Sequence, residues 1–345
     1  MKKISAIVVN WNGKDVLSGC LRSLLDQDYK DLEILVVDNG SEDGSQDFIK
    51  NEFPSVVLIE NKENLGFGPA VNKGFQQASG DYFIFLNNDL ALQPDCLRQL
   101  KELLDSDSTI GAAIPKILYY SDAENNSSGE GVRINSYGVL INYTGIACPN
   151  LIDQVDRPDL PLTESACGGI FMIPRNVYEN VGGFDDELFL YHEDHDLSWR
   201  IRMMGWKLMV TPKSICSHHY NFNKGVLKFY RSEKNRLHIL LKNFECKTLW
   251  LIAPAIFLVE ISQIIHSLFH GWFGLKLKSY METLAEFVKI SRKRRRIQST
   301  RKVADKEIVR LYQDTIAVSG LKNPLVDYFL NPILKIYWFC IRGLI

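Results

Sequence analysis

The sequence has few of the features that quickly place a protein in a functional class. Its formal net charge is −1, so charge gives no general argument for nucleic-acid binding. Its seven cysteines are odd in number and show no C-x-x-C spacing, which favours neither a disulfide framework nor a zinc ribbon. We expect the first strand to begin by Ile4, which leaves no room for a signal peptide before it. These absences agree with an enzyme that faces the cytosol.

What the sequence does contain is an alternation of strand and helix patterns. At 345 residues the chain exceeds one core of ordinary size, so two units are expected. Apolar runs typical of buried parallel strands cover 4–10, 32–37, 56–60 and 82–86. Helices are expected over 15–25, from near Ser45, and from Pro69 to Ala78. This order predicts an α/β fold with a doubly wound, mainly parallel, Rossmann-like sheet.

Polar side chains follow three of these strands at the point where each strand ends. They are Asn10-Trp11-Asn12, Asp38-Asn39 and Asn87-Asn88-Asp89. Ligands of parallel sheets bind beyond the carboxyl ends of the strands, so these groups share the edge where chemistry usually occurs. Asp89 suits a divalent cation that also binds a diphosphate, and Asp38 suits a ribose or a pyrimidine base. The alternative is an Asx turn that merely closes a strand.

A glycine-rich segment, Asn64-Leu65-Gly66-Phe67-Gly68, opens the helix that contains Pro69. Its glycines permit a tight loop whose backbone could approach a diphosphate. Gly-x-Gly without a third glycine is also common in ordinary βα loops. The order and spacing of all these segments together are therefore a stronger signal than any one of them.

In that order and spacing, the segments resemble the inverting family 2 glycosyltransferases with a GT-A fold, in particular their rhamnosyltransferase-like branch. The resemblance rests first on 8–12, 36–44, 64–68, 72–74 and 80–89. A second block, 168–175, 182–185 and 191–200, resembles the acceptor-side and catalytic segment of that family. The resemblance extends over residues 4–245.

This resemblance implies transfer of a sugar from a nucleoside diphosphate donor to an acceptor hydroxyl, with inversion at the anomeric carbon. Such a displacement needs a cation, Mg²⁺ or Mn²⁺, at the leaving diphosphate and a carboxylate base that faces the hydroxyl. By resemblance the base lies in the pair Glu193-Asp194, at its second acid, Asp194. The metal ligands are Asp89 and His218, with His219 as the alternative to His218.

The donor-binding residues that the resemblance implies are Asn10, Asn12, Asp38, Asn64, Gly66, Asn72 and Asn88. One departure concerns the metal motif, which has two or three acids in many relatives. Here residues 87 and 88 are amides, and only Asp89 carries a charge. Amide oxygens attract a hard cation less strongly, so metal binding should depend on the charge that the diphosphate brings.

Two segments near the expected base have simpler interpretations. Glu193-Asp194-His195-Asp196 could be a solvated first helical turn, in which Asp196 pairs with Arg200 at i,i+4. Gly182-Gly183 indicates a helix stop and a tight turn, not a phosphate cradle.

The remaining regions set the expected domain boundaries. Residues 119–162 are polar and turn-rich, which predicts a lid or acceptor loop, with Ser121 to Gly129 as its most polar part. We expect a catalytic domain over 1–245, with a nucleotide-sugar half at 1–118 and an acceptor half at 119–245. A helical, membrane-associated region is expected over 246–345.

The membrane prediction depends on three features beyond residue 245. An apolar run at 249–273 is followed by apolar residues at helical spacing over 277–288 and by a basic cluster at 292–296. An amphipathic helix beside basic residues is typical of a surface that lies on an anionic leaflet. The rival, one span at 249–273, would carry the basic cluster away from the catalytic side, against the positive-inside tendency. We therefore expect peripheral or monotopic association at the cytoplasmic face of the cell membrane.

The predicted function is transfer of a sugar, with rhamnose as the leading candidate, from a UDP- or dTDP-sugar to a glycan or lipid-linked hydroxyl in cell-surface polysaccharide or glycoconjugate synthesis. Nucleic acid is not an expected partner. One alternative is a zinc hydrolase that uses His192, His195, His218 and His219, although no H-E-x-x-H spacing is present. The other is an inactive membrane-bound scaffold with the same fold.

Overall fold

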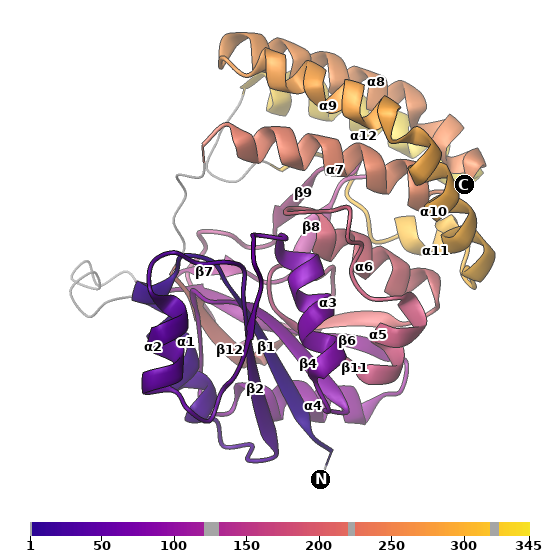
Figure 1. Cartoon of the computed structure of the whole chain (residues 1–345). Helices are drawn as coiled ribbons and strands as arrows, with labels where there is room; N and C mark the ends of the chain where they lie inside the picture. The colour runs from indigo at the N-terminus through magenta and orange to yellow at the C-terminus, as the bar shows by residue number, and fades with distance from the viewer. Residues whose placement is uncertain (1, 121–130, 220–224, 318–323) are drawn as a thin grey trace.

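The computed structural model describes residues 2–120, 131–219, 225–317 and 324–345, and its centre is a mixed β-sheet (Figure 1). The strands are β1 Ile4–Asn10, β2 Leu32–Asp38, β3 Val57–Glu60, β4 Tyr82–Asn87, β5 Leu90–Leu92, β6 Ile110–Tyr119, β7 Ile134–Ser136, β8 Val139–Ile141, β9 Ala147–Pro149, β10 Thr163–Glu164, β11 Phe171–Pro174 and β12 Lys207–His218. The sheet order is β10-β12-β6-β11-β4-β1-β2-β3. Strands β4, β1, β2 and β3 are parallel, so their carboxyl ends meet at one edge.

The first half of the chain follows the predicted alternation closely. Its helices are α1 Lys14–Leu25, α2 Ser45–Glu52, α3 Phe67–Gln77 and α4 Cys96–Ser106, and the second half adds α5 Arg175–Val181 and α6 Glu193–Met203. Each expected strand of the first half is present with its ends within one residue of the predicted ones. The α/β interpretation with a mainly parallel core is therefore confirmed.

Strand β1 explains why the sheet is covered on both faces. All seven of its residues are buried. Ile4, Ala6 and Val8 pack with α1, α2 and α4 on one face, whereas Ile7 and Val9 pack with α3, α5 and α6 on the other. Alternate side chains of one strand thus enter two separate cores, which requires the continuous apolar run seen in the sequence.

The predicted lid region, in its described part, is largely packed structure. Strand β7 pairs with β6, and β8 and β9 form a hairpin. The rings of Tyr137 and Tyr143 are buried, and Tyr143 stacks on Trp338 near the carboxyl end of the chain. The polar stretch from Ser121 to Gly129 lies outside the described residues.

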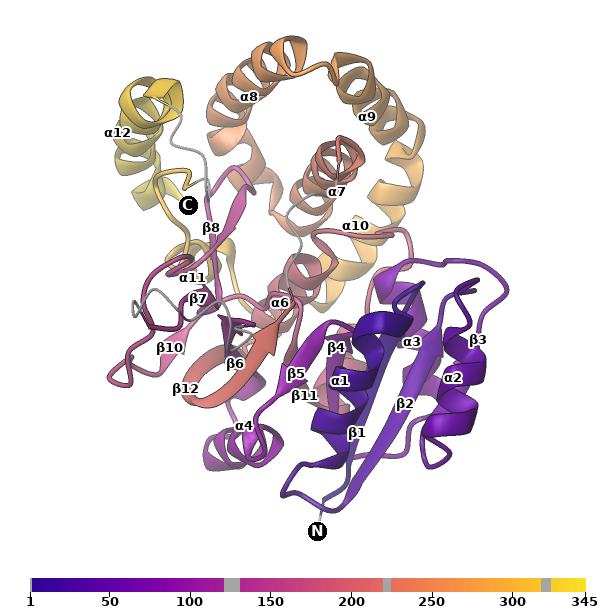
Figure 2. The ribbon, with the colours of Figure 1, turned by 90° about the vertical axis from the view of Figure 1, so that its left-hand side faces the viewer.

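The carboxyl-terminal third is helical, as predicted. It contains α7 Leu227–Asn243, α8 Cys246–Phe269, α9 Phe273–Ala285, α10 Phe287–Thr300, α11 Asp305–Val309 and α12 Asn331–Ile341, with short helical turns at Val326–Leu330 and Arg342–Leu344. Figure 2 shows α8, α9 and α10 arranged around α7. Within the described residues, α8 alone is long and apolar enough to cross a membrane, a criterion that core helices of soluble proteins also meet.

The basic cluster on α10 is less exposed than a leaflet-binding surface requires. Lys293 forms an ion pair with Asp185, and Arg294 donates to the Leu241 carbonyl oxygen at 2.6 Å. These two side chains tie α10 to the rest of the protein, so the prediction that the whole cluster faces a leaflet is wrong for them. Only Arg292, Arg295 and Arg296 of this cluster are exposed.

Candidate active site

The polar strand ends form one hydrogen-bonded row, as their order in the sheet requires. Asn10, the last residue of β1, lies in the middle of this row. It donates through Nδ2 to Asp38 Oδ2 at 2.8 Å, and it accepts through Oδ1 from Asn88 Nδ2 at 2.7 Å. In the sheet, Asn10 of β1 lies opposite Asp38 of β2, and Val9 of β1 lies opposite Asn87 of β4. The tips of three neighbouring strands are thus linked through one amide.

The carboxylate of Asp38 is fully engaged within the protein. Its Oδ1 accepts from the Ser41 backbone N–H at 2.9 Å and from Gln46 Nε2 at 2.8 Å. Its Oδ2 accepts from Asn10 and from the Ser41 hydroxyl at 2.7 Å. A ribose or base can bind the Asp38 carboxylate only if one of these partners moves away. Among them, Gln46 alone has a long side chain. Asp38 therefore organises the loop after β2 before it binds anything.

Two residues beside Asn10 complete this corner. Asn12 has a positive φ of 48°, and its Oδ1 accepts from the Glu42 backbone N–H at 2.8 Å, so it shapes the loop. Trp11 between them is 55% exposed. Sequence reasoning did not select this indole, although an aromatic residue between two polar ones at a strand tip was a usable signal. Such a ring can stack on a base.

The glycine loop before α3 is closed by another segment of the chain. Gly66 has a φ of 88°, and a Cβ there would overlap the Phe189 carbonyl. Its N–H donates to Asn64 Oδ1 at 2.9 Å, and the Phe67 N–H donates to the Phe189 carbonyl oxygen at 2.9 Å. Because both N–H groups already donate to protein oxygens, neither is available to a diphosphate. These contacts therefore do not support the expected approach of a diphosphate to this backbone. Close packing by itself explains the glycine.

Asn72, another expected donor-binding residue, also has internal partners. Its Nδ2 donates to the Phe184 carbonyl oxygen at 3.0 Å and to Asp186 Oδ1 at 2.7 Å, and its Oδ1 accepts from the Tyr178 hydroxyl at 2.6 Å. These contacts favour a role in joining α3 to the segment after α5. Asn39, which is not among the expected donor-binding residues, links the end of β2 to the loop before α3, because its Nδ2 donates to the Gly66 carbonyl oxygen at 3.0 Å.

Asp89 lies beside His218 at the next position along the edge. Strand β12 pairs with β5 so that His218 is opposite Leu90, and His218 Nε2 is 3.2 Å from Asp89 Oδ2. The other carboxylate oxygen, Oδ1, is buried and has no hydrogen-bond partner among the described residues. One carboxylate and one imidazole are a fitting donor set for Mn²⁺, or less well for Mg²⁺, when a diphosphate supplies further oxygens. His219 differs, because its ring stacks on Tyr120.

The expected base lies at the first turn of α6, close to the end of β4. Asp194 Oδ1 accepts from the His195 N–H at 2.8 Å, and Oδ2 accepts from the Gly169 N–H at 3.3 Å. Gly169 is two residues before Phe171, which pairs with Phe85 in β4. Since Asn87 to Asp89 begin two residues after Phe85, Asp194 and the strand tips belong to the same edge of the molecule.

Glu193, the neighbour of Asp194, has different surroundings. It is only 7% exposed, and its Oε2 has no hydrogen-bond partner among the described residues. Burial, together with the charge of Asp194, raises the pKa of Glu193 to about 8. At neutral pH this carboxyl group therefore mostly carries its proton.

The interpretation of this turn as a solvated one is wrong. Asp196 does pair with Arg200, at 2.8 Å, but it is fully buried and also lies 2.9 Å from Lys242 Nζ of α7. Burial opposes ionisation of Asp196, and the Arg200 and Lys242 charges outweigh it, so its pKa is lowered. Gly182 ends α5 with a φ of 80°, which confirms the predicted helix stop.

The histidines of the proposed zinc hydrolase do not converge on one site. His192 Nδ1 and His195 Nδ1 are 2.9 Å apart, but both rings are buried, and burial lowers both pKa values. His218 lies with Asp89, and His219 stacks on Tyr120. In the described ranges no three His, Cys, Asp or Glu side chains are grouped as metal ligands. The hydrolase alternative is not supported.

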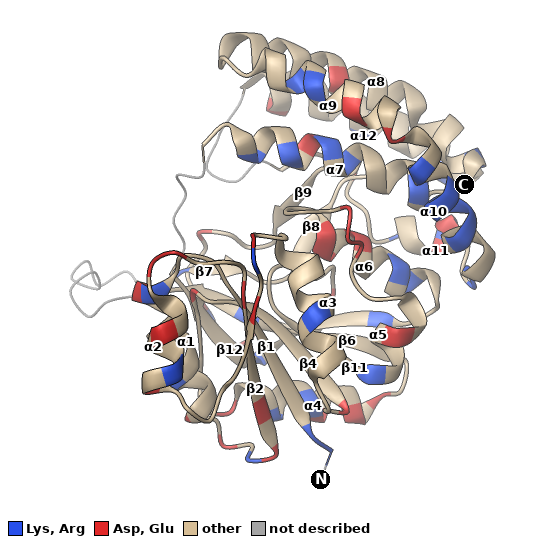
Figure 3. Cartoon of the chain, in the orientation of Figure 1, with Lys and Arg blue, Asp and Glu red and all other residues tan. Residues whose placement is uncertain are grey.

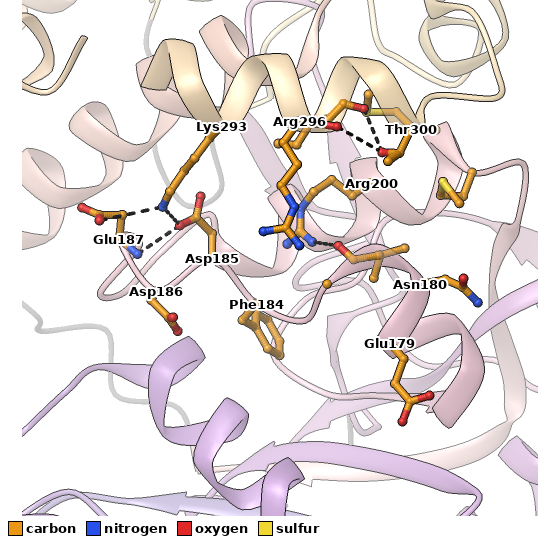
Figure 4. A pocket seen from close by; sticks show the side chains of 15 residues that line it. Glu179, Asn180, Phe184, Asp185, Asp186, Glu187, Arg200, Lys293, Arg296 and Thr300 are labelled. Carbon is orange, nitrogen blue, oxygen red and sulfur yellow. Dashed lines mark hydrogen bonds and ion pairs between the residues drawn. The ribbon is translucent and has the colours of Figure 1, made fainter. Parts of the chain in front are cut away.

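A pocket of about 420 Å³ lies between α5, α6 and α10 (Figure 4), and its lining includes none of the strand-tip residues. Its charged lining includes Lys293, Arg296 and Asp185, and neither Asp38, Asp89 nor Asp194 contributes to it. Lys293 is already paired with Asp185, as the dashed line in Figure 4 indicates. The pocket is therefore not the site formed by the strand ends.

Comparison with known protein families gives one match that covers half of the chain. The model described as glycosyl transferase family 2 matches residues 5–182. An N-acetylglucosaminyl-diphospho-decaprenol L-rhamnosyltransferase of Mycobacterium tuberculosis is 25% identical over 242 residues, which cover 64% of this chain and 78% of that protein. A poly-beta-1,6-N-acetyl-D-glucosamine synthase of Staphylococcus aureus is 24% identical over 223 residues, or 63% of this chain, and the match spans half of its length.

Two solved structures share the arrangement of elements. GalNAc-T7 with UDP, GalNAc and Mn²⁺ superposes with a TM-score of 0.57 at 19% identity, over 70% of this chain and 49% of that one. The mannosyltransferase PcManGT from Pyrobaculum calidifontis, in complex with GDP-Man and Mn²⁺, has a TM-score of 0.50 at 16% identity, over 83% of this chain and 86% of that one. At these identities the likeness establishes the fold alone, which is of the GT-A type.

Proposed function

Because this chain belongs to glycosyl transferase family 2 and is a transferase, we propose that it moves a sugar from a nucleoside diphosphate donor to an acceptor hydroxyl with inversion. The donor is a UDP- or dTDP-sugar, and rhamnose is the leading sugar because a relative that covers 64% of the chain is named as an L-rhamnosyltransferase. That relative's name also contains a diphospho-decaprenol, which supports a lipid-linked acceptor. The product is part of a cell-surface glycan.

The observation that supports this proposal most directly is the hydrogen-bonded row from Asp38 through Asn10 to Asn88, with Asp89 next to it. Asp89 and His218 would hold a divalent cation, which neutralises charge on the departing diphosphate when bound. The buried, unpartnered Asp89 Oδ1 fits this role, because a buried carboxylate oxygen is costly unless something binds it.

Asp194 would act as the base on the other side of the reacting carbon. Its carboxylate accepts two backbone N–H bonds, which keep it oriented. As the acceptor hydroxyl attacks, Asp194 takes its proton, and the sugar leaves the diphosphate in the same displacement. Exposed Trp11 would stack on the base of the donor.

The carboxyl-terminal helices support association with a membrane surface. Trp250 and Phe257 on α8 are 82% and 68% exposed. Further exposed apolar side chains on α8, α9, α10 and α12 include Ile265, Leu268, Phe269, Met281, Leu284, Phe287, Val288, Ile336 and Phe339. Figure 3 shows few charges on α8 and α12. A surface of this kind fits the interfacial region of a leaflet, where a lipid-linked acceptor is presented.

The proposal is tested by thermal-shift and calorimetric titration of the full chain with UDP- and dTDP-sugars, with and without Mn²⁺. Asp89→Ala should weaken donor binding about tenfold or more with Mn²⁺ and by less than about twofold without it. Asp81→Ala is a matched control, because Asp81 precedes the same strand at its opposite end. If no nucleoside diphosphate sugar stabilises the wild-type protein or loses its sugar to an acceptor, the proposed function is wrong.

A further inference from the structure

Helix α7 lies along the segment that leads to the expected base, residues 185–192. The Arg231 guanidinium is 4.2 Å from the centroid of the Phe189 ring, and Ser232 Oγ is 3.0 Å from His192 Nε2. These two α7 residues are followed three or four positions later by Asn235. One face of α7 therefore supports a segment that is far from it in the sequence.

The end of this segment has an unusual backbone. Tyr191 and His192 have φ values of 70° and 67°, so two consecutive residues other than glycine adopt left-handed geometry immediately before α6. A tyrosine rarely adopts this conformation, because its Cβ is crowded by the backbone. Such geometry persists only where neighbouring groups hold it in place.

Asn235 binds the backbone of this turn through two hydrogen bonds. Its side-chain amide is buried, with 4% of the residue exposed. Its Nδ2 donates to the Leu190 carbonyl oxygen at 3.0 Å and to the Tyr191 carbonyl oxygen at 2.8 Å. One amide group thus donates to the carbonyl just before the left-handed pair, that of Leu190, and to the carbonyl of its first member, Tyr191.

We propose that Asn235 is a positioning residue for the base Asp194, an inference that rests on the proposed function. By fixing the Tyr191 carbonyl, it fixes the left-handed turn from which α6 starts. The direction of the first turn of α6 then determines where the Asp194 carboxylate lies relative to Gly169 and the end of β4. The amide touches no reacting group, and it acts only through the backbone.

Three variants separate this role from a general loss of packing. Asn235→Ala removes both hydrogen bonds, and Asn235→Asp puts a carboxylate against two carbonyl oxygens. The matched control is Leu240→Ala, because Leu240 is equally buried on α7 and packs in the core instead of against residues 185–192. All comparisons are made on the full chain, below the unfolding temperature of every variant.

Hydrogen exchange of the backbone is the readout that needs no substrate. Amides of residues 189–196 should exchange about tenfold faster in Asn235→Ala and in Asn235→Asp than in wild type, and should change by less than about twofold in Leu240→Ala. If these amides exchange alike in Asn235→Ala and Leu240→Ala, the positioning role is wrong.

Turnover gives the second readout, with a nucleotide sugar that the wild type accepts. Both Asn235 variants should lower kcat about tenfold or more, while the affinity for UDP or dTDP with Mn²⁺ stays within about twofold. An equal loss of kcat in Leu240→Ala would overturn the inference. A different outcome is faster exchange of residues 189–196 in the Asn235 variants of a protein whose wild type transfers no sugar. This result would show that Asn235 stabilises the turn, but it would contradict the proposed function.

Discussion

Glu193 and Asp194 are adjacent carboxyl groups with different surroundings. Asp194 is half-buried and accepts from two backbone N–H groups, which suits a carboxylate. Glu193 is buried, its Oε2 has no partner among the described residues, and its pKa is raised to about 8. A carboxyl group that keeps its proton at neutral pH is a poor proton acceptor, so Glu193 is the weaker candidate for the base.

Asp194→Asn should therefore lower turnover by about 100-fold or more, because an amide cannot accept the proton of the hydroxyl. Donor binding, measured by calorimetry with Mn²⁺, should stay close to that of the wild type. Glu193→Gln is the matched control, since glutamine imitates the protonated acid, and it should keep most of the turnover. The opposite ranking of the two variants would move the base to Glu193.

The raised pKa of Glu193 also predicts how stability depends on pH. The folded protein holds the Glu193 proton up to a pH of about 8, whereas the unfolded chain releases it near the ordinary value of 4.5. The contribution of Glu193 to the free energy of unfolding is therefore lost as the pH rises from about 4.5 to about 8. Glu193→Gln removes the effect, so its thermal unfolding midpoint should exceed that of the wild type at pH values near 8 by several degrees more than near 4.5. A constant difference across this window would show that Glu193 does not titrate in it.

Some residue roles could be predicted from the sequence and others could not. The positions of Asn10, Asp38 and Asp89 follow from where apolar strands end, which is a local pattern. The burial of Asp196 is not local, because it depends on Lys242, which lies 46 residues further along the chain. For the same reason, nothing in the sequence near Asp38 indicates that Gln46 and Ser41 already occupy its carboxylate.

At the scale of elements, α7 joins the catalytic sheet to the carboxyl-terminal helices through buried charges. Lys242 lies between Asp185, in the segment before α6, and Asp196 on α6, and Lys293 of α10 also pairs with Asp185. Burial opposes ionisation of Asp185, but the two lysines outweigh it and lower its pKa. The position of α6 thus depends on helices that follow it in the sequence.

Lys242→Met should cost about 3–5 kcal/mol of unfolding free energy, because it leaves two buried carboxylates without this cation. Denaturant unfolding of the full chain measures this. Lys247→Met is the control, since Lys247 is exposed at the start of α8, and it should change stability by less than about 0.5 kcal/mol. A similar small change in Lys242→Met would mean that Asp185 and Asp196 find other partners.

Strand β12 extends further than its sequence pattern indicates. The sequence is strand-like over Lys207 to Thr211, and Pro212, which follows, has no N–H for a ladder. In the structure the pairing with β6 is irregular between Thr211 and Ile215 and then resumes as far as His218. This irregularity carries the strand past the proline, and it places His218 beside Asp89.

At the scale of the whole molecule, buried charges determine how the apolar helices sit. Glu260 of α8 pairs with Arg236 of α7 and lies 2.7 Å from Lys276 of α9, which in turn is 2.6 Å from Glu233 of α7. Arg236 and Lys276 are almost fully buried. Removing α8 from this packing to span a membrane alone would separate Glu260 from both Arg236 and Lys276, at a cost of several kcal/mol. These buried charges therefore support in-plane association, as proposed, over a spanning α8.

The exposed apolar face can be tested as one surface with Trp250→Ser combined with Phe257→Ser. The pair should reduce co-flotation of the full chain with vesicles containing anionic lipid about tenfold or more, because each buried aromatic ring contributes about 1.5–3 kcal/mol. A matched control replaces Val57 and Val155, exposed apolar residues outside the carboxyl-terminal helices, and should leave flotation unchanged. For in-plane association we also expect alkaline carbonate to release the wild-type protein from membranes. Retention after that wash would favour a spanning α8, and equal flotation of the double variant and the control would show that the membrane contact lies elsewhere.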